Sequence, residues 1–213
     1  TRTLKANPKG KGALIVGNPF MPNDPGSEQI KQLSNLPNAE LEARAIAPLF
    51  NTQAITGKAG TKSTILQRIS DARIIHLATH GSFYDRNGFK SWLALAPTEQ
   101  DSGILTAEEV AQLKLSADLV VLSACDTGRG RVTGDGVIGL SRSFITAGVP
   151  SVIVSLWSVP DAPTADLMKA FYQQLQRNPD KAQALRQAML TTLKTHPNPR
   201  DWAAFTLIGE AQR

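Results

Sequence analysis

Two side chains suited to nucleophilic catalysis lie at the ends of apolar runs in this chain. His80 closes the run RIIHLATHG at residues 73–81, and Cys125, the only cysteine, lies in the run DLVVLSACDTG at residues 118–128. A thiolate attacks carbonyl carbon, and an imidazole can take up or supply a proton near neutral pH. The pair therefore predicts cysteine-based chemistry if the fold brings the two groups together.

The two runs predict neighbouring parallel strands. Each is apolar on both faces and bounded by turn residues, which is typical of strands buried in a parallel sheet. Ligands of such sheets bind outside the carboxyl ends of the strands, where His80 and Cys125 lie. Because neighbouring strands are about 4.8 Å apart, we expect the imidazole and the thiol to meet at one groove.

The other histidines are expected to have structural or surface positions. His76 lies about 13 Å down the strand from His80, so we predict a hydrogen-bonded core histidine. His196 precedes a proline and is expected at the surface. A lone cysteine is most often a small buried hydrophobe. The position of Cys125, at a strand end before a polar turn, favours a chemical role.

Composition indicates an ordinary soluble globular protein. The chain has 213 residues, of which 41% are hydrophobic and 19% charged, enough for one core. No apolar run approaches the roughly 18 residues of a membrane span, and we find no secretory signal. A single cysteine permits no internal disulfide and favours a reducing compartment, the cytoplasm. Since the chain begins with Thr1, we expect it to be a piece of a longer protein.

The net charge of +5 is concentrated before the first predicted strand. Residues 1–12 contain four basic and no acidic side chains, and the rest of the chain is nearly balanced. Such a segment is more often a solvated linker than a binding surface, so we expect neither a nucleic-acid nor a membrane partner. We interpret residues 1–12 as a basic tail or linker and residues 13–213 as a single domain.

Strands alternate with helices along the chain. Further strands are predicted at residues 13–17, 52–56, 151–156 and 203–208, and helices at 38–50, 62–69, 106–113 and 137–147, with two more helices before the last strand. This order predicts an α/β fold, with about six mostly parallel strands and helices on both faces of the sheet.

Details of three segments are also predicted. Leu41, Ala45 and Leu49 should form the buried face of helix 38–50. Asn178 should cap the last helix. Residues 81–102 have no sustained period and predict a long loop, in which only 92–96 could form a small strand.

Two glycine-rich patterns suggest nucleotide binding but lack its context. Residues 134–139 match the dinucleotide fingerprint, which must leave a strand directly, whereas the predicted strand ends about ten residues earlier. Residues 57–63 resemble a phosphate loop, but Thr61 replaces the glycine that should precede the lysine. A nucleotide-binding α/β domain is therefore the least favoured interpretation.

The motifs HLATHG, VLSACDTG and SVIVSLWSVPD resemble the CHAT domain of the caspase-like cysteine peptidases. The resemblance extends from about Asn38 to Glu210. It implies a caspase-like three-layer sandwich and hydrolysis of peptide bonds by a Cys-His dyad without a cofactor. It also implies that repeat domains, often tetratricopeptide repeats, precede this domain.

The resemblance assigns roles to individual residues. Cys125 corresponds to the nucleophile and His80 to the general acid and base. The backbone N–H groups of Gly81 and Cys125 correspond to the oxyanion hole. Ser123 corresponds to a position that lines the first specificity pocket, although it is neither acidic nor basic.

Three more residues are candidates for substrate binding. Asp126 follows the nucleophile directly. Trp157 and Asp161 follow the next predicted strand, where they could form a pocket wall and a polar contact. A packed Trp157, and an Asp161 that caps the following helix, are equally good interpretations.

The sequence thus predicts a cysteine endopeptidase that acts on protein or peptide substrates. The alternative is a catalytically silent domain of the same fold that binds proteins. No spacing of acidic or other ligating residues specifies a metal site.

Overall fold

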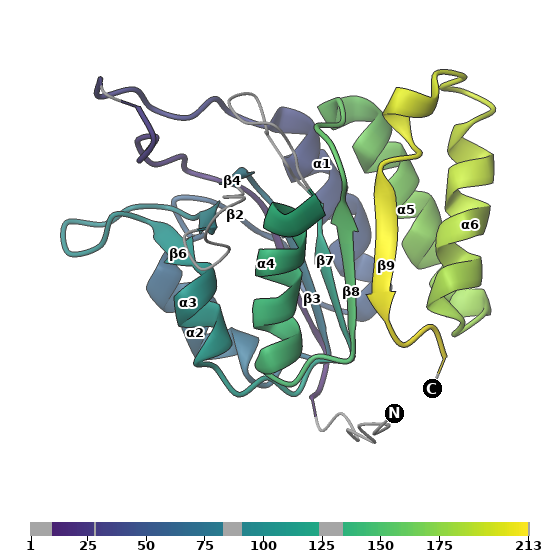
Figure 1. Ribbon diagram of the computed structural model, residues 1–213, viewed down its shortest axis with the longest axis horizontal. Coiled ribbons are helices and arrows are strands. Elements are labelled where there is room, and N and C mark those ends of the chain that lie inside the picture. Colours follow the sequence, from purple (N-terminus) through teal and green to yellow (C-terminus); the bar gives the residue numbers. More distant parts are fainter. Residues whose placement is uncertain (1–9, 28, 83–90, 124–133, 213) are drawn as a thin grey trace.

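The computed structural model describes residues 10–27, 29–82, 91–123 and 134–212, and for residues 134–139 it describes the backbone alone. A six-stranded sheet forms the centre of the molecule (Figure 1). In sheet order its strands are β2 (Ile55–Gly57), β1 (Ala13–Pro19), β3 (Ile74–Ala78), β7 (Leu119–Leu122), β8 (Ser151–Ser155) and β9 (Phe205–Gly209). Neighbouring strands are parallel except for β8 and β9, which are antiparallel. The predicted mostly parallel sheet is confirmed.

Helices cover both faces of this sheet, as predicted (Figure 1). One layer contains α1 (Pro37–Ile46), α5 (Asp161–Arg177) and α6 (Lys181–Thr192). The other contains α2 (Lys62–Ile69), α3 (Ala107–Ala111) and α4 (Gly134–Thr146). Short 3₁₀ helices lie at Ala47–Phe50 and Pro199–Asp201.

The central strands are buried on both faces, which explains their unbroken apolar sequences. On β1, Leu14 and Val16 belong to the core under α2, α3 and α4, whereas Ile15 belongs to the core under α1, α5 and α6. Successive side chains of a strand point to opposite faces, so each apolar pair supplies both cores. The helix layers that pack on the two faces of the sheet thereby hold the ends of its strands in place.

Helix α1 turns a different face to the sheet from the one predicted. Its buried residues are Ala39, Glu42, Ala43 and Ile46, while Leu41 is 61% exposed. The reason is a close approach to Gly17 on β1, where an added Cβ would lie 2.3 Å from the Ala39 carbonyl oxygen and 2.5 Å from the Ala43 Cβ. Small side chains allow this contact, and leucine does not fit there.

Replacing Gly17 tests this close approach. Because a methyl group would overlap backbone and side-chain atoms of α1, Gly17→Ala should lower the free energy of unfolding by about 3 kcal/mol. Gly17→Val should lower it further. Urea unfolding followed by circular dichroism measures both, and an unchanged midpoint in either variant would contradict the packing described.

A second, three-stranded antiparallel sheet was not predicted. It contains β4 (Gly81–Ser82), β5 (Trp92–Ala94) and β6 (Ile104–Thr106). Strands of two or three residues are too short to show a hydrophobic period, and for that reason the sequence predicted a loop with at most one strand. Residues 83–90, within the predicted loop, lie outside the described part of the chain.

Helix ends agree in part with the sequence. A capping box of Thr106 and Glu109 begins α3, within the range of the helix predicted at residues 106–113. The cap of α6 is Asp180, whose side chain accepts from the Gln183 N–H at 2.9 Å, and not Asn178. Asn178 has an extended backbone and accepts instead from Asp180 N–H at 3.0 Å. Among the described helices, none is both long and apolar enough to cross a membrane.

Candidate active site

The strands that precede His80 and Cys125 are neighbours, as predicted. β3 and β7 pair in parallel from Ile74 opposite Leu119 to Leu77 opposite Leu122, a constant offset of 45 residues. The same offset separates His80 from Cys125 in the sequence. Cys125 and Asp126 themselves lie outside the described residues.

His80 is held in place through its ring and its backbone. It is 2% exposed, and its Nε2 lies 2.7 Å from the Ser34 carbonyl oxygen. A carbonyl can only accept a hydrogen bond, so Nε2 carries the proton and Nδ1 is the basic nitrogen of the neutral ring. The His80 carbonyl accepts from Ala94 N–H of β5 at 2.8 Å, which ties the histidine to the small sheet. Gly81, which follows it, is buried in β4.

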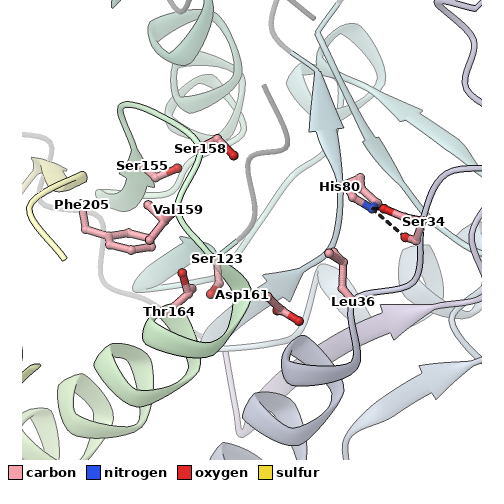
Figure 2. Close-up of a pocket in the computed structure, with 10 residues that line it drawn as sticks. All are labelled: Ser34, Leu36, His80, Ser123, Ser155, Ser158, Val159, Asp161, Thr164 and Phe205. Carbon is pink, nitrogen blue, oxygen red and sulfur yellow. Dashed lines mark hydrogen bonds between the residues drawn. The ribbon is translucent and has the colours of Figure 1, made fainter. Parts of the chain in front are cut away.

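A cavity of about 120 Å³ opens beside His80 at the carboxyl ends of β3, β7 and β8. Figure 2 shows His80 and Ser34 on one side of it, with Ser155, Ser158 and Phe205 on the opposite side. Its described lining is mainly hydroxyl-bearing and apolar, with one carboxylate; the residues are Ser34, Leu36, His80, Ser123, Ser155, Ser158, Val159, Asp161, Thr164 and Phe205. This position is the one at which open parallel sheets bind ligands.

The structure brings Ser123 and Asp161 together in this cavity and places Trp157 elsewhere. Asp161 does not cap its own helix: its Oδ2 accepts from Asn38 N–H of α1 at 2.8 Å. The Trp157 Nε1–H donates to the Arg200 carbonyl oxygen at 3.1 Å, and Trp157 is not part of the described lining. Two of the four substrate-binding candidates therefore line one cavity with His80.

A buried polar network leads from Ser123 into the core. The Ser123 hydroxyl donates to Glu42 Oε1, and His76 Nε2 lies 2.8 Å from the same oxygen. His76 Nδ1 contacts the Tyr172 hydroxyl at 3.1 Å. All four residues are buried. His76 is thus a hydrogen-bonded core histidine, as predicted.

Tyr172 titrates far from its ordinary range in this network. Burial and then the Glu42 carboxylate raise the pKa of its hydroxyl well above the usual value of 10.0. The folded protein therefore keeps Tyr172 protonated at pH values where the unfolded chain ionises it. This contribution to stability is complete below pH 10 and is lost as the pH rises above that value.

Tyr172→Phe tests both roles of this hydroxyl. At pH 7 it should lower the free energy of unfolding by about 1–3 kcal/mol, because His76 loses a buried partner. Between pH 9 and pH 11 the variant should then lose about 1 kcal/mol less stability than the wild type, since one pKa unit is worth about 1.4 kcal/mol. Urea unfolding at the three pH values measures this. Equal losses of stability between pH 9 and pH 11 in the wild type and the variant would show that ionisation of Tyr172 does not cause the loss.

The nucleotide-binding patterns do not form nucleotide sites. The glycines of the dinucleotide pattern lie in helical backbone at the start of α4, and not in a turn that leaves a strand. Lys62, in the phosphate-loop pattern, is engaged by Ile104 O at 2.9 Å and by Glu109 Oε1 at 2.6 Å. Among the described residues no cluster of histidine, cysteine or acidic side chains could hold a metal ion.

The fold is that of the caspase-like cysteine peptidases. The Arg-specific cysteine proteinase gingipain R superimposes with a TM-score of 0.65 at 10% identity, over 99% of this chain and 49% of the gingipain chain. The complex of the pro- and mature domains of Porphyromonas gingivalis RgpB gives a TM-score of 0.62 at 13% identity, over 99% of this chain and 50% of the RgpB chain. At such low identity these likenesses concern the fold alone.

Within that class, the chain belongs to the CHAT domain family, whose sequence profile matches residues 1–210. It is also 31% identical to tetratricopeptide repeat protein 28 of Mus musculus and, at the same identity, to that of Homo sapiens. Each alignment covers 92% of this chain but only 9% of the relative. The family that the motifs around His80 and Cys125 indicated is therefore confirmed.

Two residues that contact side chains of the cavity, Ser34 and Glu42, were not found from the sequence. Ser34 lies in a segment without periodicity, and its backbone carbonyl and its hydroxyl contact His80 Nε2 at 2.7 and 3.4 Å. Glu42 lies on the buried face of α1, which differs from the predicted face of Leu41, Ala45 and Leu49. The sequence does contain a sign of this position. Glu42 lies three residues after Ala39 and one before Ala43, the two small residues that face Gly17.

Proposed function

We propose that this CHAT domain is a cysteine endopeptidase, with Cys125 as the nucleophile and His80 as the general acid and base. The observation that carries the proposal is the cavity beside His80 at the end of β3. In the sequence, Cys125 comes three residues after the end of β7, the strand that pairs with β3. The shared offset of 45 residues supports equal heights for the two groups. The family supports the reaction class.

The hydrogen bond from His80 to Ser34 determines how the histidine would act. With its proton fixed on Nε2, the ring takes the thiol proton on Nδ1 and carries a positive charge. The thiolate attacks the scissile carbonyl carbon, and a C–S bond forms. The tetrahedral oxyanion accepts from the N–H groups of Gly81 and Cys125, each of which is worth about 10²–10³ in rate.

The reaction then proceeds in two halves. The C–N bond breaks, and His80 Nδ1–H protonates the departing amine. A water molecule then gives a proton to His80 and forms a C–O bond to the acyl carbon. The C–S bond breaks, which releases the carboxylic acid, and His80 returns the proton to the sulfur and so restores the thiol. No cofactor takes part in either half.

We further propose that residues 13–213 form this domain and that residues 1–12 link it to repeat domains of the same protein. The relatives in mouse and human carry tetratricopeptide repeats in their names, and the chain spans only 9% of their length. Specific protein substrates would then be recognised outside the domain. The single cysteine is best kept reduced in the cytoplasm.

A peptidyl acyloxymethyl ketone tests the proposal, since such a reagent alkylates a thiolate only after it binds in a substrate groove. The adduct should form on Cys125 in the wild type, should be absent in Cys125→Ala, and should form at least tenfold more slowly in His80→Ala. Peptide mapping by mass spectrometry locates it. A wild-type protein that remains unlabelled, while iodoacetamide modifies Cys125 freely, would favour a silent, protein-binding domain.

A further inference from the structure

A second, larger cavity lies at the opposite end of the strands from His80. It opens where β3 and β7 begin, at the lower end of the sheet in Figure 1, and has a volume of about 620 Å³. Pockets that hold small molecules have volumes of about 300–1,000 Å³. Its described walls come from the residues before β1, from the starts of β3 and β7, and from the segment that joins α5 to α6. The second cavity therefore has the size of a ligand site, and the proposed peptidase reaction does not use it.

One part of its lining is apolar. Phe50, Leu175 and Pro179 line it on the helical side, and Ile74 and Leu119 are the first residues of the two strands. The Phe50 ring is held edge-on against Tyr172, with 5.4 Å between the ring centroids. Apolar surfaces associate because both then leave water. An occupant should therefore have an apolar body.

The other part of the lining is charged, with one carboxylate between two cations. Asp118 Oδ1 lies 3.9 Å from Lys181 Nζ, and Asp118 Oδ2 lies 3.7 Å from Arg73 Nη2. The Lys181 and Asp118 side chains are only 4% and 11% exposed, whereas that of Arg73 is 61% exposed. Two positive charges and one negative charge leave a net charge of +1 on the described lining.

A second acid near Lys181 does not remove this excess of positive charge. Asp180 precedes Lys181 but is not part of the described lining. Its carboxylate accepts from Gln183 N–H at 2.9 Å and from the Gln212 amide at 2.7 Å. It also lies at the positive end of α6, which stabilises a negative charge. Because the Asp180 charge is compensated there, a ligand with one negative charge would neutralise the second cavity.

Other occupants suit this lining less well. A cationic ligand would meet Arg73 and Lys181, and a neutral apolar molecule would cover buried charges that it cannot compensate. A dianion such as inorganic phosphate would exceed the net charge and has no apolar body. Residues 1–9, which precede Gly10 of the lining, contain three basic and no acidic side chains and so have the wrong charge.

We infer that the second cavity binds a small-molecule monocarboxylate with an alkyl or aryl body. The carboxylate accepts hydrogen bonds from the ammonium group of Lys181 and from the more exposed guanidinium of Arg73, and the body lies against Phe50 and Leu175. Hydrogen bonds between ionised groups are strong, and more so where little water competes. Asp118 holds the two cations near each other but repels the ligand. Binding needs no catalysis, so the inference is independent of the proposed peptidase function.

A titration of the isotope-labelled chain followed by NMR tests the site. The probes are phenylbutyrate and octanoate, and their neutral amides and their amines serve as ligand controls. With a carboxylate we expect saturable shifts of the backbone amide signals of Gly12, Ile74 and Leu119, which line the second cavity. The corresponding amide should bind at least about tenfold more weakly, because it lacks the charge-assisted hydrogen bonds. The amines should cause no saturable shift at these residues.

Three variants assign the binding to side chains. Lys181→Met keeps the apolar stem and removes the charge, and should weaken carboxylate binding by about 10- to 100-fold. Arg73→Gln should weaken it by about two- to fivefold, since exposed ion pairs contribute little. Asp118→Asn should tighten it by about threefold or more, because the repelling charge is lost. Opposite effects at Lys181 and Asp118 are not expected from a purely structural role of this ion pair.

Arg177→Gln is the matched control for the charge variants. It removes one positive charge from an exposed residue in the last turn of α5 that is not part of the described lining. Circular dichroism melting shows which variants are folded, and Arg73→Gln and Asp118→Asn still test the site if Lys181→Met does not fold.

Three results would overturn the inference. The first is the absence of any saturable shift at the lining residues with either carboxylate at millimolar concentration. The second is equal affinity for a carboxylate and its amide. The third is equal weakening of binding in Arg177→Gln and in the folded lining variants, which would show that overall charge, and not the second cavity, attracts the ligand.

Discussion

Cys125→Ala is expected to lower the rate of peptide-bond cleavage by at least about 10⁴-fold, the largest effect of any single substitution in this chain. The proposed reaction needs a C–S bond to the substrate, and no other cysteine can replace the missing sulfur. Cleavage of a mixed-sequence peptide library, followed by mass spectrometry, measures the loss. Thermal unfolding of the variant provides the control, because a catalytic role predicts an intact fold.

Persistence of the same cleavage pattern in Cys125→Ala would contradict this role. It would point to a contaminating protease or to a different nucleophile. The wild type and the variant must therefore be purified in parallel and compared bond by bond. If every cleavage disappears in the variant, each of them depends on the Cys125 thiol.

His80→Ala is expected to lower kcat by about 10²–10⁴-fold, the typical value of a positioned general acid and base. The thiol then has to ionise without help, and an ordinary thiol has a pKa of about 8.5. Alkylation of Cys125 by iodoacetamide should therefore rise steeply between pH 7 and pH 9 in the variant. The wild type should react faster at pH 7 and rise less.

His76→Ala serves as the matched comparison for His80→Ala. His76 is equally buried but lies in the core network with Glu42 and Tyr172. Its loss should lower thermal stability without giving the pH profile of His80→Ala. Identical iodoacetamide profiles in the wild type and His80→Ala would contradict a role for His80 in activating the thiol.

Much of the arrangement around His80 could be predicted from residues alone. The runs that end in His80 and Cys125 are apolar at successive positions, and only strands buried on both faces need such sequences. The two strands were also expected to adjoin, and the register of β3 and β7 confirms it. The residues at the ends of these two strands were therefore the part of the site that could be predicted from the sequence.

The cavity itself could not be predicted in the same way. Glu42 lies on the buried face of α1 because Gly17 lets the helix approach β1 closely, a contact between distant parts of the chain. The Ser34 carbonyl reaches His80 from an irregular segment, where neither period nor motif exists. Asp161 caps α1 instead of its own helix. Such contacts depend on packing and leave no local pattern.

Trapping the acyl-enzyme is the most direct test of the central claim, which is covalent catalysis by Cys125 beside His80. The wild-type chain is mixed with a set of peptide esters that differ in the terminal residue, quenched in acid within milliseconds to seconds, and digested for mass spectrometry. The account predicts the mass of the acyl group on the peptide that contains Cys125, and its absence in Cys125→Ala. Hydrolysis of the ester with no acyl group on Cys125 at any time, at an equal rate in both proteins, would contradict it.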